Sequence, residues 1–239
     1  METQTQAQIY LADQRGCSQG DYFQSHHSFN FGRYFDETRQ PFGTLRLLND
    51  DLLKPGHGAR MQVEQNTLVV VIPVVGGLEY NSEVGNGFLE AGQSQLFSLA
   101  SGMGYDIINP YDTELINYVV IWLTDTSPDF TPGIQQGQFD LRVKNELLPL
   151  ADFNYKETRQ QRVLRGFIGR YDGRQEDIYQ LIEPQPSGVF VFILSGAFEV
   201  QNRLLHERDG LALTNVQNNT IDFEALSNDA LLLVLEVSR

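Results

Sequence analysis

The sequence predicts an all-β protein with two barrel-like domains, and three observations lead to this prediction. The apolar segments are short and rich in Val, Ile, Leu and Phe, which is typical of strands rather than helices. Turn residues separate these segments along the whole chain,. One strand-and-turn unit also occurs twice, and its double use indicates two related domains.

The expected strands follow one another through both halves of the chain. They cover 43–48, 68–75, 97–99, 115–123, 189–194 and 231–237. Asn-Gly and Asp-Gly pairs predict tight turns, at 86–87, 172–173 and 209–210. A segment rich in Asp, Pro and Gly, 124–137, predicts a linker, and 143–150 is either a helical turn or a short strand. We therefore expect domains at 1–130 and 131–239.

The internal repeat supports this division. LVVVIPVVGGLEY (68–80) aligns with GVFVFILSGAFEV (188–200). Each copy reads as a buried strand, a glycine turn and a returning strand that carries a glutamate. Such a hairpin is the centre of a small β-barrel, so each half of the chain is expected to form one.

Charge and composition restrict the partners. The formal net charge is −14, and an acidic surface repels nucleic acid and anionic membranes. Arginines do cluster between 159 and 174, where we expect a solvated loop or strand edge. The single cysteine, Cys17, excludes an internal disulfide framework and is expected to be unreactive,. No signal peptide and no apolar run of membrane-spanning length are visible. We expect a cytoplasmic protein.

Several segments in the first half together resemble the pirin family, in particular its quercetinase-like branch. They are ADQRG (12–16), SFNFGRYFD (28–36), LRLLNDDLLKPGHG (45–58) and GGLEYNSEVGNG (76–87). The resemblance implies a bicupin, that is, two RmlC-like jelly-roll β-barrel domains: a pirin-like cupin at 1–130 and a C-terminal cupin at 131–239. It also implies one iron-type metal, held in the first domain by three histidines and a glutamate.

This sequence departs from the family at the metal ligands. Laid on without a gap, the family frame places the two histidines of its first motif on Gln62 and Glu64, and the His and Glu of the second on Tyr105 and Ile107. Such a set does not suit iron or catalytic zinc. We therefore expect no metal and no cofactor. The alternative is a relocated metal site, built from Glu64, His57 and either His26 or His27.

The same frame suggests where a pocket lies. If the family's histidines point inward, then strand alternation turns Gln62, Glu64 and Arg60 inward as well, with Tyr105 approaching from a facing strand. A carboxylate in that position needs a partner. Either Tyr105 and Gln62 satisfy Glu64 and the pocket is filled, or these groups bind a small polar ligand without metal. No catalytic residue is assigned. The acidic triplet Asn49-Asp50-Asp51 lacks the ligand spacing of a calcium loop and is expected to form a turn,.

Three functions follow from these expectations. The first is a metal-independent bicupin that binds a small ligand or another protein. The second is a quercetin 2,3-dioxygenase-like oxygenase with the relocated metal, acting on a flavonol or a similar phenol. The third is a non-catalytic regulator, because some pirins associate with transcription factors. The net charge favours a protein partner over direct contact with nucleic acid in that case,.

Overall fold

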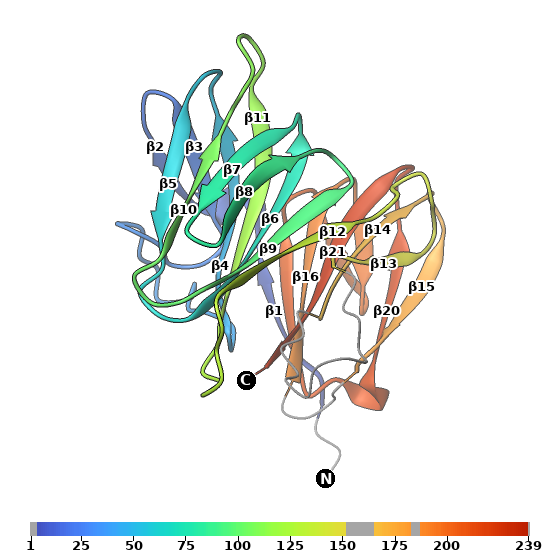
Figure 1. Ribbon diagram of the computed structural model, residues 1–239. Coiled ribbons are helices and arrows are strands. Elements are labelled where there is room, and N and C mark those ends of the chain that lie inside the picture. Colours follow the sequence, from blue (N-terminus) through green and yellow to red (C-terminus); the bar gives the residue numbers. More distant parts are fainter. Residues whose placement is uncertain (1–3, 152–164, 183–186, 239) are drawn as a thin grey trace. The chain divides into compact units, whose positions relative to one another are not determined.

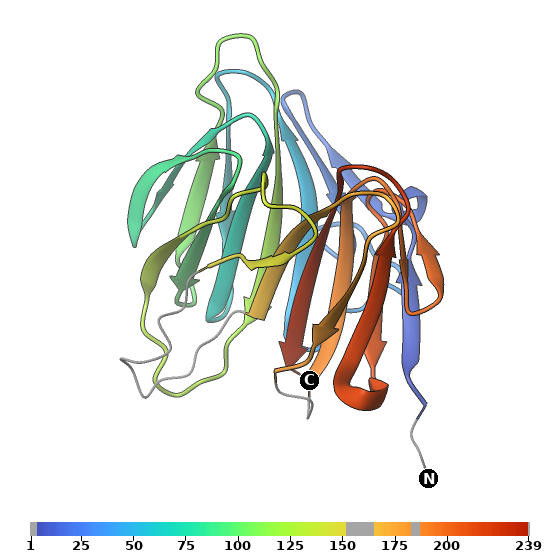
Figure 2. The same ribbon diagram turned by 90° about the vertical axis from the view of Figure 1, so that its right-hand side faces the viewer.

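The computed structural model describes residues 4–151, 165–182 and 187–238. Within them, strands make up nearly all regular structure (Figures 1 and 2). The described helices are two short 3-10 turns, Ala12–Gln14 and Gln217–Asn219. The all-β prediction is confirmed. The chain divides into two compact units, which we call the N-terminal unit (16–138) and the C-terminal unit (4–15, 139–150 and 165–238).

The N-terminal unit contains two antiparallel sheets. The larger has the order β12-β9-β6-β11-β4-β3-β2, with bounds Gly133–Gln138, Gln93–Leu99, Thr67–Val75, Ile116–Thr124, Leu45–Leu53, Phe23–His27 and Gly16–Gln19. The smaller has the order β5-β10-β7-β8, with bounds Gly58–Gln62, Gly104–Ile108, Leu78–Ser82 and Gly85–Leu89.

The C-terminal unit repeats this arrangement. Its larger sheet has the order β1-β19-β16-β21-β14-β13, with bounds Gln6–Tyr10, Gly210–Thr214, Ser187–Ser195, Ala230–Ser238, Arg165–Tyr171 and Leu147–Pro149. Its smaller sheet has the order β15-β20-β17-β18, with bounds Glu176–Gln180, Thr220–Ala225, Phe198–Val200 and Arg203–Leu205.

The internal repeat is confirmed by this topology. The order β9-β6-β11-β4 in one unit corresponds to β19-β16-β21-β14 in the other. The repeated sequence segments form β6 with β7 and β16 with β17. Each unit has its own apolar core between its two sheets. Val69 and Val71 of β6 contribute to the first core, and Val189 and Val191 of β16 contribute to the second.

The N-terminal strand belongs to the second half of the molecule. β1 pairs with β19 over its whole length, from Gln6–Thr214 to Tyr10–Gly210, whereas a cut at residue 130 counts it with the first half. Strand β12 takes up the second part of the expected linker and pairs with β9. The segment 143–150 contains a short strand, β13, and no helix.

Three expected turns are wrong. At Asp209-Gly210 the chain turns earlier, at Glu207 and Arg208, and Gly210 begins β19. Asn86 and Gly87 lie inside β8, and the chain turns at Glu83 and Val84 instead. Gly87 is needed for close packing, because a Cβ there would lie 2.5 Å from the Tyr80 hydroxyl. The triplet from Asn49 to Asp51 is not a turn either. It lies buried in the middle of β4.

Candidate functional site

The N-terminal unit has a surface hollow of about 720 Å³ at the end of its sandwich, which we call the N-terminal hollow. Three of the four expected pocket residues, Arg60, Gln62 and Glu64, line it together. The other lining residues come from β4, β5, β6, β11 and nearby loops: Asn30, Phe31, Gly32, Pro41, Arg46, Leu47, Met61, Gln65, Thr67, Trp122 and Thr124.

The expected inward orientation of the polar residues on this segment is wrong. Arg60, Gln62 and Glu64 are exposed, whereas Ala59 and Met61 pack on the core. A strand with one face on a core turns its apolar residues inward, and a shift of one residue exchanges the two faces. In this segment the apolar residues face the core, so the polar residues face the opposite way from the direction that the family frame suggests. Glu64 is therefore not a buried carboxylate.

Residues at the rim of the hollow contact β10 and the loop that precedes it. The Gln62 side-chain amide donates to the Gly102 carbonyl oxygen at 2.6 Å. Arg60 forms an exposed ion pair with Asp106 at 3.3 Å, which contributes little to stability. The Ser101 hydroxyl donates to the Glu64 backbone oxygen at 2.7 Å. Gln62 is thus engaged with backbone and does not satisfy the Glu64 carboxylate.

Tyr105 lies beneath the hollow rather than in it. Its side chain is buried, and its ring stacks on Phe97 with centroids 5.7 Å apart. The Trp122 indole N–H donates to the Tyr105 hydroxyl oxygen at 3.0 Å. Burial raises the pKa of Tyr105 far above its ordinary value, so the phenol stays neutral,. Tyr105 therefore fixes the indole of Trp122, which forms part of the hollow's lining.

Arg46 is the charged group of the hollow that sequence reasoning missed. It is exposed and lines the hollow beside Trp122. It makes no hydrogen bond or ion pair with other described residues. The register between β4 and β11 shifts at Trp122 and Leu123, opposite Leu47 and Leu45, and such irregularities redirect side chains. No feature of the sequence pattern predicts this bulge.

No histidine lines the N-terminal hollow. His27 is fully buried and bonded to Ser18 and Asn49. His57 stacks on Tyr22 with ring centroids 4.1 Å apart, and its Nδ1 donates to the Pro55 carbonyl oxygen. Among the described residues, no group of three or more His, Cys, Asp or Glu side chains is placed to hold a metal ion. The groups at the hollow therefore do not fit the three-histidine, one-glutamate metal site that the family resemblance implies.

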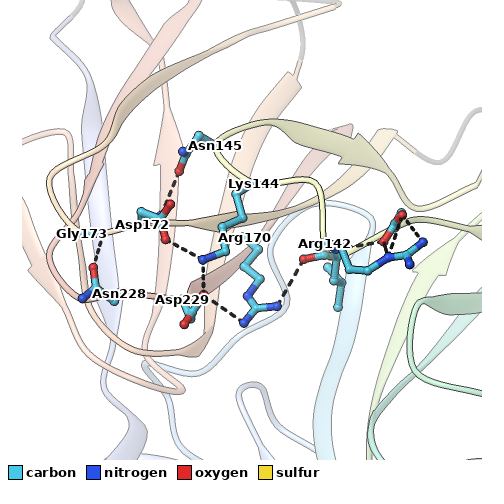
Figure 3. Close-up of polar contacts among 10 residues, drawn as sticks. Arg142, Lys144, Asn145, Arg170, Asp172, Gly173, Asn228 and Asp229 are labelled. Atoms are coloured by element: carbon cyan, nitrogen blue, oxygen red, sulfur yellow. Dashed lines mark hydrogen bonds and ion pairs between the residues drawn. The ribbon is translucent and has the colours of Figure 1, made fainter.

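The arginines of the cluster between 159 and 174 are paired with acids where the structure describes them. Arg165 contacts Glu236, Arg170 contacts Asp229 and Arg174 contacts Glu224. Figure 3 shows the Arg170 pair within a larger network that also contains Lys144 and Asp172. Arg159 and Arg162 lie outside the described residues. Each described arginine of this cluster therefore has an acidic partner.

The fold and the repeated sandwich define the class of protein, which is a bicupin. A family model described as the quercetinase C-terminal cupin domain matches residues 167–237. The structure of the bacterial pirin YhhW from Escherichia coli in complex with nickel(II) superposes with a TM-score of 0.81 at 19% identity, over 98% of this chain and 99% of that one.

Sequence relatives agree with this class. A quercetin 2,3-dioxygenase of Escherichia coli (strain K12) is 24% identical over 228 residues, which cover 94% of this chain and 97% of that protein. The pirin-like protein YhaK of the same strain is 26% identical over 205 residues, which cover 84% of each chain. The chain is similar to pirin-like and quercetinase-like proteins over most of its length. No helix in the described part of the chain is long and apolar enough to cross a membrane.

Proposed function

We propose that this pirin-like bicupin binds a small organic ligand in its N-terminal hollow without the help of a metal. The observation that carries the proposal is that Arg46, a cation without a described partner, lines the same hollow as the partly buried Trp122. Phe31 also lines the hollow, and its ring lies edge-on to Trp122 at 6.3 Å. A guanidinium beside aromatic faces is suited to a flat molecule that carries a carboxylate.

The composition of the rim supports a binding role over the family's metal chemistry. The hollow offers a carboxamide from Gln62 and one carboxylate from Glu64, without an imidazole. The relocated site of the oxygenase alternative is not supported by the geometry, because Glu64 lines the hollow and none of the histidines does. The quercetinase names of the relatives remain the argument for that alternative, and the metal content of the protein decides it.

The first experiment measures transition metal in tag-free protein produced with added iron and nickel. We expect trace metal only. The second experiment screens small aromatic carboxylates by thermal shift. Binding of each hit is then measured through the fluorescence of the single tryptophan, Trp122. Stoichiometric metal would contradict the proposal and make an oxygenase assay the next step.

A matched pair of variants tests the role of Arg46. Arg46→Gln should weaken binding of a carboxylate hit about tenfold or more, the cost of one charge-assisted hydrogen bond. Lys54→Gln makes the same change of charge at an exposed position outside the hollow and should leave affinity unchanged. Equal effects of both variants, or no hit in the screen, would overturn the assignment of the hollow as the binding site.

A further inference from the structure

Inside the N-terminal unit, a row of polar side chains crosses the larger sheet, and we call it the polar row. Ser18 opposes Ser25, Ser25 opposes Asp51, and Asp51 opposes Tyr118, so that four neighbouring strands contribute. Two residues after Ser25 on β3, His27 opposes Asn49, which lies two residues before Asp51 on β4. Directly opposed residues share a face of a sheet, and Tyr118 belongs to the core. The polar row therefore lies on the inner face.

Hydrogen bonds connect the row from its edge to its centre. The Ser18 hydroxyl lies 2.8 Å from Nε2 of His27. On the other side of the ring, Nδ1 lies 3.0 Å from Oδ1 of Asn49 and 3.3 Å from the Ser25 hydroxyl. Ser25 in turn hydrogen-bonds to the Asp51 carboxyl group. Ser18 is only partly buried and lies on β2, at the end of the sheet.

The chemistry of the partners orients every hydrogen in this chain. Oδ1 of Asn49 can only accept, so Nδ1 of His27 carries the ring hydrogen. In the neutral ring Nε2 then accepts, and Ser18 donates to it. The Ser25 hydroxyl donates to the Asp51 carboxylate and accepts from the shared Nδ1 hydrogen. All hydrogens therefore point from Ser18 toward Asp51.

Asp51 is the buried end of the chain. It is 5% exposed, and its Oδ1 atom has no hydrogen-bond partner in the described part of the protein. The groups around it are Ser25 and His27 on β3, Tyr118 on β11, Tyr105 on β10 and its neighbour Asp50. None of these is a permanent cation. Burial raises the pKa of Asp51 to about 7, against a lowering effect of the Ser25 hydrogen bond and with a further increase from Asp50,.

We propose that Asp51 is a proton-binding site that exchanges with solvent through Ser25, His27 and Ser18, and that its charge acts on the N-terminal hollow through Tyr105 and Trp122. In the uptake direction, Ser18 passes its proton to Nε2 of His27 and is reprotonated by solvent. Nδ1 of His27 passes its proton to Ser25, and Ser25 passes its own to the carboxylate. Solvent loses one proton and Asp51 gains one, and the ring hydrogen of His27 ends on Nε2. The Asn49 side-chain amide then turns over, so that its N–H group donates to the unprotonated Nδ1.

The link to the hollow uses two further contacts. The Tyr105 phenol interacts electrostatically with Asp51 and accepts the hydrogen bond from the Trp122 indole at 3.0 Å. An ionised Asp51 attracts the phenol hydrogen and places a negative charge beneath the indole. The hollow then disfavours an anionic ligand, so affinity should fall as the pH rises through about 7. This last consequence rests on the function proposed for the hollow, whereas the proton site itself does not.

Fluorescence of Trp122 in ligand-free protein tests the proton site separately from ligand binding. We expect its emission to change between pH 5.5 and 8.5 with a midpoint near 7. Asp51→Asn should abolish this titration, and Tyr105→Phe should reduce its amplitude. Constant emission of the wild-type protein, or a titration that survives Asp51→Asn, would refute the proposal whether or not the hollow binds a ligand.

Two further measurements protect the test against a variant that fails to fold. The carboxyl carbon resonance of Asp51, followed by NMR in the wild-type protein with labelled aspartate, should titrate near 7. A midpoint near pH 4 would contradict the proposed proton site. After a rapid pH jump, Ser18→Ala should slow the fluorescence change severalfold without moving its midpoint, because only the route is altered. An unchanged rate would remove Ser18 from the route.

Discussion

The interiors of the two units differ, although their strands are arranged alike. Strands β4 and β14 hold equivalent places, next to β11 and β21. β14 contributes Phe167 and Tyr171 to an apolar core, whereas β4 places Asn49 and Asp51 inside its unit. The repeat has thus preserved the architecture without preserving the character of the core. Polar groups in a core are costly unless they are bonded, so the polar row on the inner face of the larger sheet indicates a role for the N-terminal unit.

Both units bury carboxylates, and two of these, Glu236 in the C-terminal unit and Asp51 in the N-terminal unit, have opposite surroundings. Glu236 contacts Arg165 at 3.1 Å, and its other oxygen accepts from the Tyr179 hydroxyl and the Ile182 N–H, both at 2.8 Å. Asp51 has Ser25 and no cation near it. Removing the charge should therefore destabilise the C-terminal unit and stabilise the N-terminal unit at neutral or higher pH.

The largest effect is expected from Glu236→Gln. This change leaves Arg165, which is only 10% exposed, without its counter-ion. A broken buried ion pair costs about 3–5 kcal/mol, measured as the free energy of unfolding in urea. As a control, Glu236→Leu combined with Arg165→Met should recover most of the loss, since it removes both charges. A loss below 1 kcal/mol for Glu236→Gln would show that the pair is hydrated.

A smaller effect of opposite sign is expected from Asp51→Asn. The pKa of Asp51 rises from 3.8 to about 7 on folding, so the folded protein holds a proton that the unfolded chain releases between these pH values. The stability of the wild-type protein therefore falls as the pH rises through this window, and asparagine abolishes that fall. Relative to the wild type, the variant should gain on the order of 1–4 kcal/mol between pH 4 and pH 8. Parallel stability curves would contradict this.

The smallest effect is expected from Lys144→Gln in the network of Figure 3. Lys144 bridges Asp172 and Asp229 at 2.7 and 2.6 Å, but exposed ion pairs are screened by solvent. Its pKa is raised by the hydrogen bonds to these two acids, which shows attraction without implying a large contribution to stability. The melting temperature should change by no more than a few degrees, and by less in high salt. A large shift would mean that this network behaves like the buried Glu236 pair.

The sequence by itself determined the strands and the repeat. Short segments rich in β-branched residues, such as 115–123, form strands in both units, because their length and apolar pattern favour a strand over a helix. Arg60, Gln62 and Glu64 do lie together at one hollow, as the family frame suggested, and their role as ligand-binding groups stays a prediction.

Only the tertiary structure decided which side of each strand meets the core and which distant segments become neighbours. The face presented by Gln62 and Glu64 depends on a shift of one residue, which local sequence cannot fix. The pairing of β1 with β19 joins the two ends of the chain, and no local signal encodes such a contact. The polar row arises in the same way, because the register of β2, β3 and β4 brings Ser18, His27 and Asp51 together.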